Sequence, residues 1–248
     1  MGYDAPDVYA RLIGPRYAPV ADALVAVARL RPTDAVLEVG SGTGLVSARA
    51  APKVRELLAT DLSLPMLDRA RRTLRRMSNV SYLKLDYASP LPFLDDSFTL
   101  VLSGLTYLQD SAAALAEVAR VLRPGGRLAL SMWGSSYHEK RIMDAALKSV
   151  AGQRFPRASA ERVVRRLEAR GFTSVRRTDL QLTNRFASVN DYIAYRRGFG
   201  KPTNWTASLY ESFLRALHRE ATNTLSPDGS FDLGWEQVLI TAGRQRRS

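Results

Sequence analysis

The chain contains no cysteine among its 248 residues. Disulfides and thiolate metal sites are therefore excluded, while the redox state of the compartment stays open. The two histidines do not stand at the spacing of metal ligands, so no metal is expected. No apolar run approaches the roughly 18 residues that cross a membrane, and the first residues lack the basic and apolar blocks of a secretory signal. These absences predict a cytoplasmic protein.

Lysine is scarce as well, because 31 of the 36 basic residues are arginines and the formal net charge is +12. A positive balance of this size can indicate a nucleic-acid partner. An excess of arginine over lysine, however, is also produced by coding DNA rich in G and C. Most basic residues are spread along the chain, with short clusters only at 69–76, 162–170 and 244–247. We therefore expect no nucleic-acid partner.

Short apolar runs alternate with stretches of helical periodicity up to residue 133, which predicts an α/β fold with a doubly wound, mostly parallel sheet. The strands are expected at 35–39, 55–61, 80–86, 97–104, 127–133, 173–182 and 235–243, with a turn at Pro124-Gly125-Gly126. Helices are expected at 16–30, 45–51, 64–77, 111–122, 159–170, 189–198 and 206–222. Ligands of such folds bind at the carboxyl ends of the strands.

The first predicted strand ends in the loop Gly40-Ser41-Gly42-Thr43-Gly44. Glycine permits positive φ and close approach of a ligand to the backbone, and a strand, a glycine turn and a helix start together make a nucleotide-type site. A tight turn alone explains one glycine but poorly explains three. The dinucleotide fingerprint is G-x-G-x-x-G, whereas Leu45 stands where that pattern has its last glycine. The spacing thus disfavours a nicotinamide-dependent oxidoreductase.

Two aspartates follow the next two strands. Asp61 comes 21 residues after Gly40, and its carboxylate can accept both hydroxyls of an adenosyl ribose. It could instead cap the helix that begins near Ser63, but Ser63 can supply that cap itself, so ribose binding is favoured. Asp86 can accept the amino group of adenine beside the amide of Tyr87. A turn-forming aspartate explains the same position equally well.

Four motifs in order carry a family resemblance: VLEVGSGTG, LLATDLSLPMLDRAR, VSYLKLDYASPLPFLDDSFTLVLSGLTYL and EVARVLRPGGRLALSMW. They resemble class I S-adenosylmethionine-dependent methyltransferases, in particular the small-molecule branch that includes ubiquinone, menaquinone and natural-product enzymes. The resemblance covers about residues 33–133. It implies one methyltransferase domain over residues 1–248, with a helical N-terminal segment and a seven-stranded sheet whose last strand, 235–243, is antiparallel.

The resemblance also implies S-adenosylmethionine as cofactor and assigns roles to single residues. The methionine moiety is expected near Glu38, Gly40, Ser41 and Gly42, its amine near Ser103, the ribose at Asp61, and the adenine between Leu62 and Met66 with its edge at Asp86 and Tyr87. Tyr9 and Tyr17 resemble residues that fold over the cofactor in the family.

The general base is not given by the resemblance, because relatives often carry histidine after the fourth strand, where this chain has Leu105-Thr106-Tyr107. Methyl transfer mainly requires alignment of the reacting atoms, and a base only if the nucleophile arrives protonated. His138, expected on a loop after the fifth strand, is the better of the two histidine candidates for a base, and the alternative is a surface histidine in a polar run. Tyr107 could orient a substrate hydroxyl.

The acceptor is expected to be a small molecule. Residues 134–157 and 183–234 are predicted to form a helical lid, and their aromatic residues favour an apolar or aromatic acceptor. Two alternatives stay open: a member of the family that catalyses a non-methylating reaction such as a cyclisation, and an RNA methyltransferase. The oligomeric state is not predicted.

Overall fold

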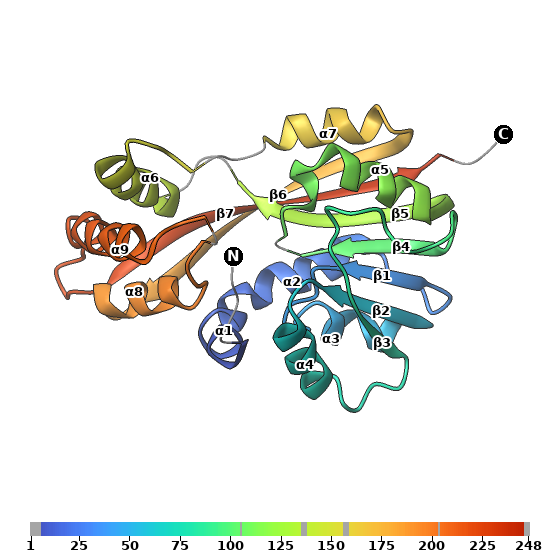
Figure 1. Ribbon diagram of the computed structural model, residues 1–248, viewed down its shortest axis with the longest axis horizontal. Coiled ribbons are helices and arrows are strands. Elements are labelled where there is room, and N and C mark those ends of the chain that lie inside the picture. Colours follow the sequence, from blue (N-terminus) through green and yellow to red (C-terminus); the bar gives the residue numbers. More distant parts are fainter. Residues whose placement is uncertain (1–5, 105, 135–137, 156–158, 203, 246–248) are drawn as a thin grey trace. The chain divides into compact units, whose positions relative to one another are not determined.

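A seven-stranded sheet forms the framework of the computed structural model, which describes residues 6–104, 106–134, 138–155, 159–202 and 204–245. The strands lie in the order β3-β2-β1-β4-β5-β7-β6 (Figure 1). Their bounds are β1 Ala35–Val39, β2 Glu56–Asp61, β3 Val80–Lys84, β4 Phe98–Ser103, β5 Leu122–Trp133, β6 Phe172–Phe186 and β7 Phe231–Arg244. Strands β3, β2, β1, β4 and β5 pair in parallel, and β7 is antiparallel to β5. The predicted fold class is confirmed, with each expected strand present.

The helices found in the described part of the chain include all seven that the sequence predicts. Their bounds are α1 Pro6–Leu12, α2 Gly14–Ala28, α3 Ser47–Ala50, α4 Leu64–Thr73, α5 Ala112–Val121, α6 His138–Ala151, α7 Ala160–Glu168, α8 Val189–Arg197 and α9 Ala207–Thr222, with 3-10 turns η1 Ala51–Lys53 and η2 Leu108–Asp110. No bounds were predicted for α1 and α6, which lie in the N-terminal segment and in the first lid segment, both expected to be helical. Serine caps start several of them: the Ser63 hydroxyl accepts the Met66 amide, and the Ser111 hydroxyl accepts that of Ala114.

The chain divides into two compact units. Unit 1 contains Met1–Arg16, Gly134–Arg157 and Gln181–Glu236, and unit 2 contains Tyr17–Trp133, Ala158–Leu180 and Gln237–Ser248. The described parts of the two segments predicted to form a lid therefore belong to unit 1, apart from residues 135–137, 156–157 and 203, which lie outside the described residues. Their role as a lid stays a prediction.

In unit 2, side chains along each strand alternate between the two faces of the sheet. Helices α5 and α7 lie on one side, and α2, α3 and α4 on the other (Figure 1). The face toward α5 and α7 is a hydrophobic core that contains Leu128, Leu130 and Met132 of β5. On the opposite face the Trp133 ring packs edge-on against Tyr17 of α2, with ring centroids 5.8 Å apart.

The predicted turn at Pro124–Gly126 is wrong, because these residues lie within β5. Leu122 already pairs with Phe98, while Arg127 pairs with Leu100, so β5 carries extra residues that β4 does not match. Gly125 takes a φ of 76° in this irregular stretch, which a residue with a side chain adopts only with strain.

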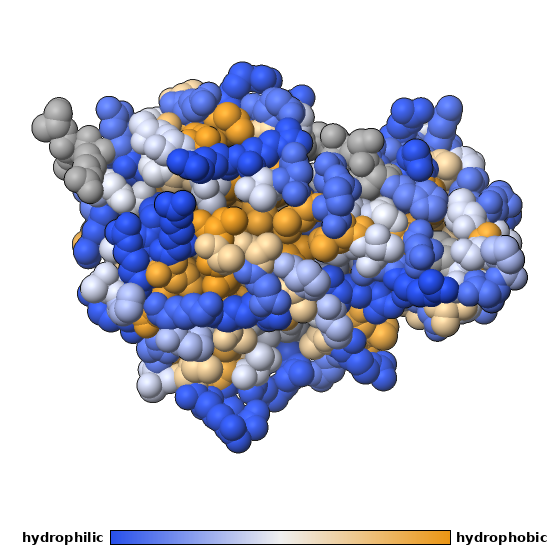
Figure 2. All heavy atoms as spheres, turned by 180° about the vertical axis from the view of Figure 1, so that it is seen from behind, coloured by the Kyte–Doolittle hydropathy of each residue, from blue (hydrophilic) through white to orange (hydrophobic). Residues whose placement is uncertain are grey.

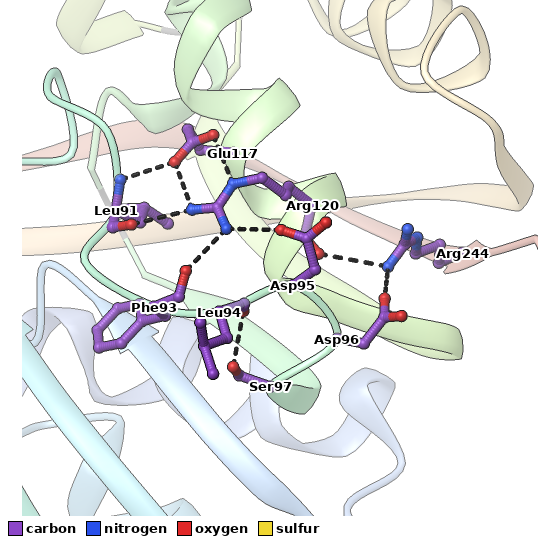
Figure 3. A network of polar contacts seen from close by, with 9 residues as sticks. All are labelled: Leu91, Phe93, Leu94, Asp95, Asp96, Ser97, Glu117, Arg120 and Arg244. Atoms are coloured by element: carbon purple, nitrogen blue, oxygen red, sulfur yellow. Dashed lines mark hydrogen bonds and ion pairs between the residues drawn. The ribbon is translucent and has the colours of Figure 1, made fainter.

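Arg120 binds the loop between β3 and β4 at several points. The Arg120 guanidinium of α5 donates to the backbone carbonyls of Leu91 (2.9 Å) and Phe93 (2.7 Å), and it pairs with the carboxylates of Asp95 and Glu117 (Figure 3). These anionic partners raise the Arg120 pKa further above its already high value. The loop that begins at the carboxyl end of β3 is thereby tied to α5.

Replacing Arg120 with methionine is expected to lower the free energy of unfolding by about 2 kcal/mol, since part-buried carbonyls and the Glu117 carboxylate lose a charged donor. Urea unfolding measures the change. Arg75→Met, at an exposed arginine of the chain, is the control and should change stability by less than about 0.5 kcal/mol. An R120M variant that unfolds at the same urea concentration as the wild type would contradict the role of Arg120 in holding the loop.

Charged residues are distributed over both units. Ion pairs join Arg49 to Asp22 in unit 2 and Arg197 to Glu211 in unit 1, and hydrophilic residues interleave with hydrophobic ones on the face shown in Figure 2. Among the described residues no helix is both long and apolar enough to span a lipid bilayer.

Candidate functional site

The glycine loop lies at the carboxyl end of β1, as predicted. Gly40, Gly42 and Gly44 take φ values of 72°, 54° and 85°, which residues with a side chain rarely adopt. The Ser41 amide donates to the Thr60 carbonyl of β2 at 2.8 Å, and the Gly44 amide donates to the Ser41 carbonyl at 2.9 Å. The loop is therefore a defined turn, anchored to the neighbouring strand.

Gly40 also fits closely against Thr106, which follows β4. A Cβ atom at Gly40 would lie 2.2 Å from Thr106 Cγ2, whereas one at Gly42 would meet nothing within 4 Å. Rotation of the Thr106 side chain away from Gly40 would break two hydrogen bonds, because its hydroxyl lies 2.6 Å from Ser103 Oγ and accepts the Leu108 amide at 3.2 Å. Glycine is thus required at position 40 for two reasons: a Cβ atom there would clash with Thr106, and the backbone has a positive φ.

Gly40→Ala is expected to lower the free energy of unfolding by about 2 kcal/mol, and Gly42→Ala by only about 1 kcal/mol, since both strain φ but only the first creates a clash. Thr106→Ser removes Cγ2 and keeps the hydroxyl. In the G40A background, T106S should therefore recover part of the lost stability. Urea unfolding of G40A, G42A, T106S and the double variant G40A/T106S measures this. Equal losses in G40A and G42A would contradict the contact with Thr106.

Asp61 ends β2 and fastens two backbone segments. Its Oδ2 accepts the Gly42 amide at 2.9 Å and its Oδ1 accepts the Ser63 amide at 2.9 Å. Burial raises the Asp61 pKa, while these backbone hydrogen bonds lower it. A carboxylate has about four acceptor positions, so the backbone amides of Gly42, Leu62 and Ser63 do not use them all. The alternative that Asp61 caps α4 is wrong, because Ser63 provides that cap.

Glu38 lies on β1, fully buried, two residues before the first glycine of the loop. Its Oε2 accepts a hydrogen bond from the Ser47 hydroxyl at the start of α3. Burial raises the Glu38 pKa to about 7; the Ser47 hydrogen bond lowers it and the nearby Asp61 charge raises it. Two carboxyl groups therefore stand at the carboxyl ends of adjacent strands.

Two serines complete this part of the site. The Ser41 hydroxyl is buried and has no hydrogen-bond partner, and such groups are rare in folded proteins. The Ser103 hydroxyl at the end of β4 lies 3.3 Å from the Val39 carbonyl and close to Thr106. An unsatisfied hydroxyl among positive-φ glycines and carboxyl groups fits a ligand with amine and hydroxyl groups.

Asp86 and Tyr87 begin the loop after β3. Asp86 is exposed, and its Oδ1 accepts the Ala88 amide at 2.9 Å while its carbonyl accepts the Ser89 amide at 3.1 Å. It therefore forms the turn considered above. Burial raises the Tyr87 pKa. The contact of these residues with adenine stays a prediction.

The remaining cofactor candidates differ in exposure. Leu62 is 59% exposed, while Met66 in the first turn of α4 is buried. Tyr17 is buried against Trp133 in unit 2. Tyr9 belongs to unit 1, where its ring packs edge-on against Phe199 with centroids 6.1 Å apart. The roles proposed for these four residues stay predictions.

Of the two catalytic candidates, His138 is the first residue of α6 rather than a loop residue. The expected loop is wrong because the apolar residues Ile142, Met143, Ala146 and Leu147 give this segment a buried helical face. Tyr107 is 44% exposed and directly precedes η2. Leu105 lies outside the described residues. Whether His138 or Tyr107 takes part in the reaction stays a prediction.

Sequence reasoning missed two supporting residues, Ser47 and Thr106. Ser47 touches Glu38 because α3 begins near the end of β1, which the expected helix at 45–51 could have suggested. Thr106 meets Gly40 only because β4 pairs with β1. No local pattern in the sequence indicates that contact.

Several known proteins with related sequences are named methyltransferases. Residues 36–126 match a protein family described as a methyltransferase domain. An uncharacterized protein of Mycobacterium bovis is 30% identical, with 96% of this chain and 91% of the relative covered. The malonyl-acyl-carrier-protein O-methyltransferase of Methylococcus capsulatus is 33% identical, with 76% of this chain and 68% of the relative covered.

The fold is similar to that of solved structures. The YcgJ protein of Bacillus subtilis has a TM-score of 0.68 at 20% identity, with 92% of this chain and 98% of that chain covered. This similarity of fold agrees with the sequence relatives and with the geometry of the site, and together they identify the class of protein. The chain belongs to the S-adenosylmethionine-dependent methyltransferase family, and its cofactor is S-adenosylmethionine.

Proposed function

We propose that this methyltransferase transfers the methyl group to an O, N or C atom of a small, apolar or aromatic metabolite. The observation that carries the proposal is Asp61, which holds the Gly42 and Ser63 amides while keeping acceptor positions free at the carboxyl edge of the sheet. S-adenosylmethionine supplies an activated methyl group when bound. With the cofactor held by these residues, the acceptor atom would form a bond to the methyl carbon while the carbon–sulfur bond breaks and its electron pair passes to sulfur.

The protein's own residues would bind the cofactor and orient it for the transfer. Asp61 would accept ribose hydroxyls, and the Ser41 hydroxyl and the Glu38 carboxyl would accept the methionine amine. The Glu38 carboxyl and the Ser41 hydroxyl stand in a region from which water is largely excluded, since both residues are buried. Charge-assisted hydrogen bonds are stronger there than in water. Where the nucleophile arrives protonated, its proton passes to water or to a side chain such as His138.

Calorimetry with S-adenosylhomocysteine and with NADH tests the cofactor site first. The proposal expects S-adenosylhomocysteine to bind and NADH not to bind. The transfer itself is tested with methyl-labelled cofactor and three acceptors: a planar phenol, a malonyl thioester on acyl carrier protein, and tRNA. Label in the phenol supports the proposal. Label only in the thioester or in tRNA, or a product that forms without label, would overturn it.

A further inference from the structure

Gln237 of β7 is fully buried, and neither its amide oxygen nor its amide nitrogen has a hydrogen-bond partner. An amide buried in this way loses its hydrogen bonds to water without replacing them, which destabilises the folded protein. Buried polar groups of native proteins are nearly always paired. A side chain with both ends unpaired therefore indicates a partner outside the chain.

The strand pairing fixes where this amide lies. Gln237 is the partner of Trp133, the last residue of β5, in the antiparallel ladder between β5 and β7. Paired residues point to the same face of a sheet. The next pair, Met132 and Val238, belongs to the hydrophobic core beneath α5 and α7, so Gln237 and Trp133 point to the opposite face. They also lie at the carboxyl end of β5, the edge at which ligands of such folds bind.

The same face carries Glu38. Its neighbours in β1, Leu37 and Val39, both belong to the core beneath α5 and α7, so the Glu38 side chain points to the other face. Strand β4 lies between β1 and β5. Gln237 therefore stands on the same face of the sheet as Glu38, but three strands away from β1 in the strand order, and is thus separated from the glycine loop that follows β1.

We propose that Gln237 binds the methyl acceptor, and that this acceptor is a planar ring compound carrying a hydrogen-bond donor next to an acceptor. A glutamine amide presents its oxygen and its NH2 group side by side, and a carboxamide or a hydroxy-carbonyl group satisfies both at once. The Trp133 ring, on the same face, offers the flat apolar surface. The inference rests on the proposed function and narrows its substrate class.

Binding of two ring compounds tests the proposal in protein saturated with S-adenosylhomocysteine: 2-naphthamide, which carries the donor and acceptor, and naphthalene, which carries neither. The wild-type protein should bind 2-naphthamide at least about tenfold more tightly, because a buried polar group discriminates strongly against a ligand that leaves it unpaired. Gln237→Met has a similar volume and no amide. Its preference should fall below about threefold, with affinity for S-adenosylhomocysteine changed by less than about twofold.

Stability gives a second readout. Because the amide is unpaired in the free protein, Q237M should unfold at the same or a higher urea concentration than the wild type. Thr241→Val is the matched control, since Thr241 lies on the same face of β7 opposite Ala129 and away from the carboxyl edge. It should keep the wild-type preference for 2-naphthamide.

Three results would overturn the proposal: no preference in the wild type, an unchanged preference in Q237M, or a clear loss of stability in Q237M, which would assign the amide a structural role. Each can occur while S-adenosylhomocysteine still binds, and the inference then fails without the proposed function. If the wild-type protein does not bind S-adenosylhomocysteine, both the inference and the proposed function are wrong.

Discussion

Replacing Asp61 with asparagine is expected to weaken S-adenosylhomocysteine binding by roughly one hundredfold, about 2 to 3 kcal/mol. The two carboxylate oxygens accept the Gly42 and Ser63 amides. Asparagine keeps the shape but offers one oxygen, so its NH2 group faces one of these N–H groups. The variant loses a charge-assisted acceptor for the ligand and a tie that shapes the loop.

Calorimetry measures the affinity, and circular dichroism with urea unfolding checks that D61N still folds. Asp68→Asn is the matched control, because Asp68 is exposed and pairs with Arg71 on the surface of α4. Its affinity for S-adenosylhomocysteine should stay within about twofold of the wild type, since exposed ion pairs contribute little. A D61N variant that binds as tightly as D68N would show that Asp61 is not part of the cofactor site.

Much of the fold could be predicted because local periodicity and topology agree. In β1 every residue from Ala35 to Val39 is buried, so its apolar run is a direct signature of a central parallel strand. Ser63 and Ser111 mark helix starts by a local hydrogen bond. The start of α6 at His138 was missed although Ile142 and Ala146 repeat at helical spacing, because the polar run around His138 suggested a loop.

The site could be predicted only as far as neighbours in sequence define it. The glycine loop and Asp61 stand at strand ends that the chain itself marks. By contrast, the contact of Gly40 with Thr106 depends on the pairing of β1 with β4, and the position of Gln237 beside Trp133 depends on the antiparallel pairing of β7. Such contacts join residues far apart in the chain, and no local pattern specifies them.

The second large effect concerns Glu38, whose pKa is raised from 4.5 to about 7 by burial. An acid with a higher pKa in the folded than in the unfolded protein binds its proton more tightly when folded. Its contribution to stability is therefore greatest below about pH 4.5 and is lost as the pH rises through about 7. We expect Glu38→Gln, which mimics the protonated acid, to match the wild type near pH 4.5 and to exceed it by about 3 kcal/mol at pH 8.

Urea unfolding of both proteins at the two pH values measures this difference. Glu56→Gln on β2, at an exposed glutamate paired with Arg55, is the control and should change stability by less than about 0.5 kcal/mol. The same E38Q variant should bind S-adenosylhomocysteine more weakly at pH 8, because a neutral amide attracts the ligand's ammonium less than a carboxylate does. Stability and binding then change in opposite directions, as expected of a buried acid retained for its ligand. An E38Q variant that is less stable at pH 8 would instead assign Glu38 to the support of the fold through Ser47.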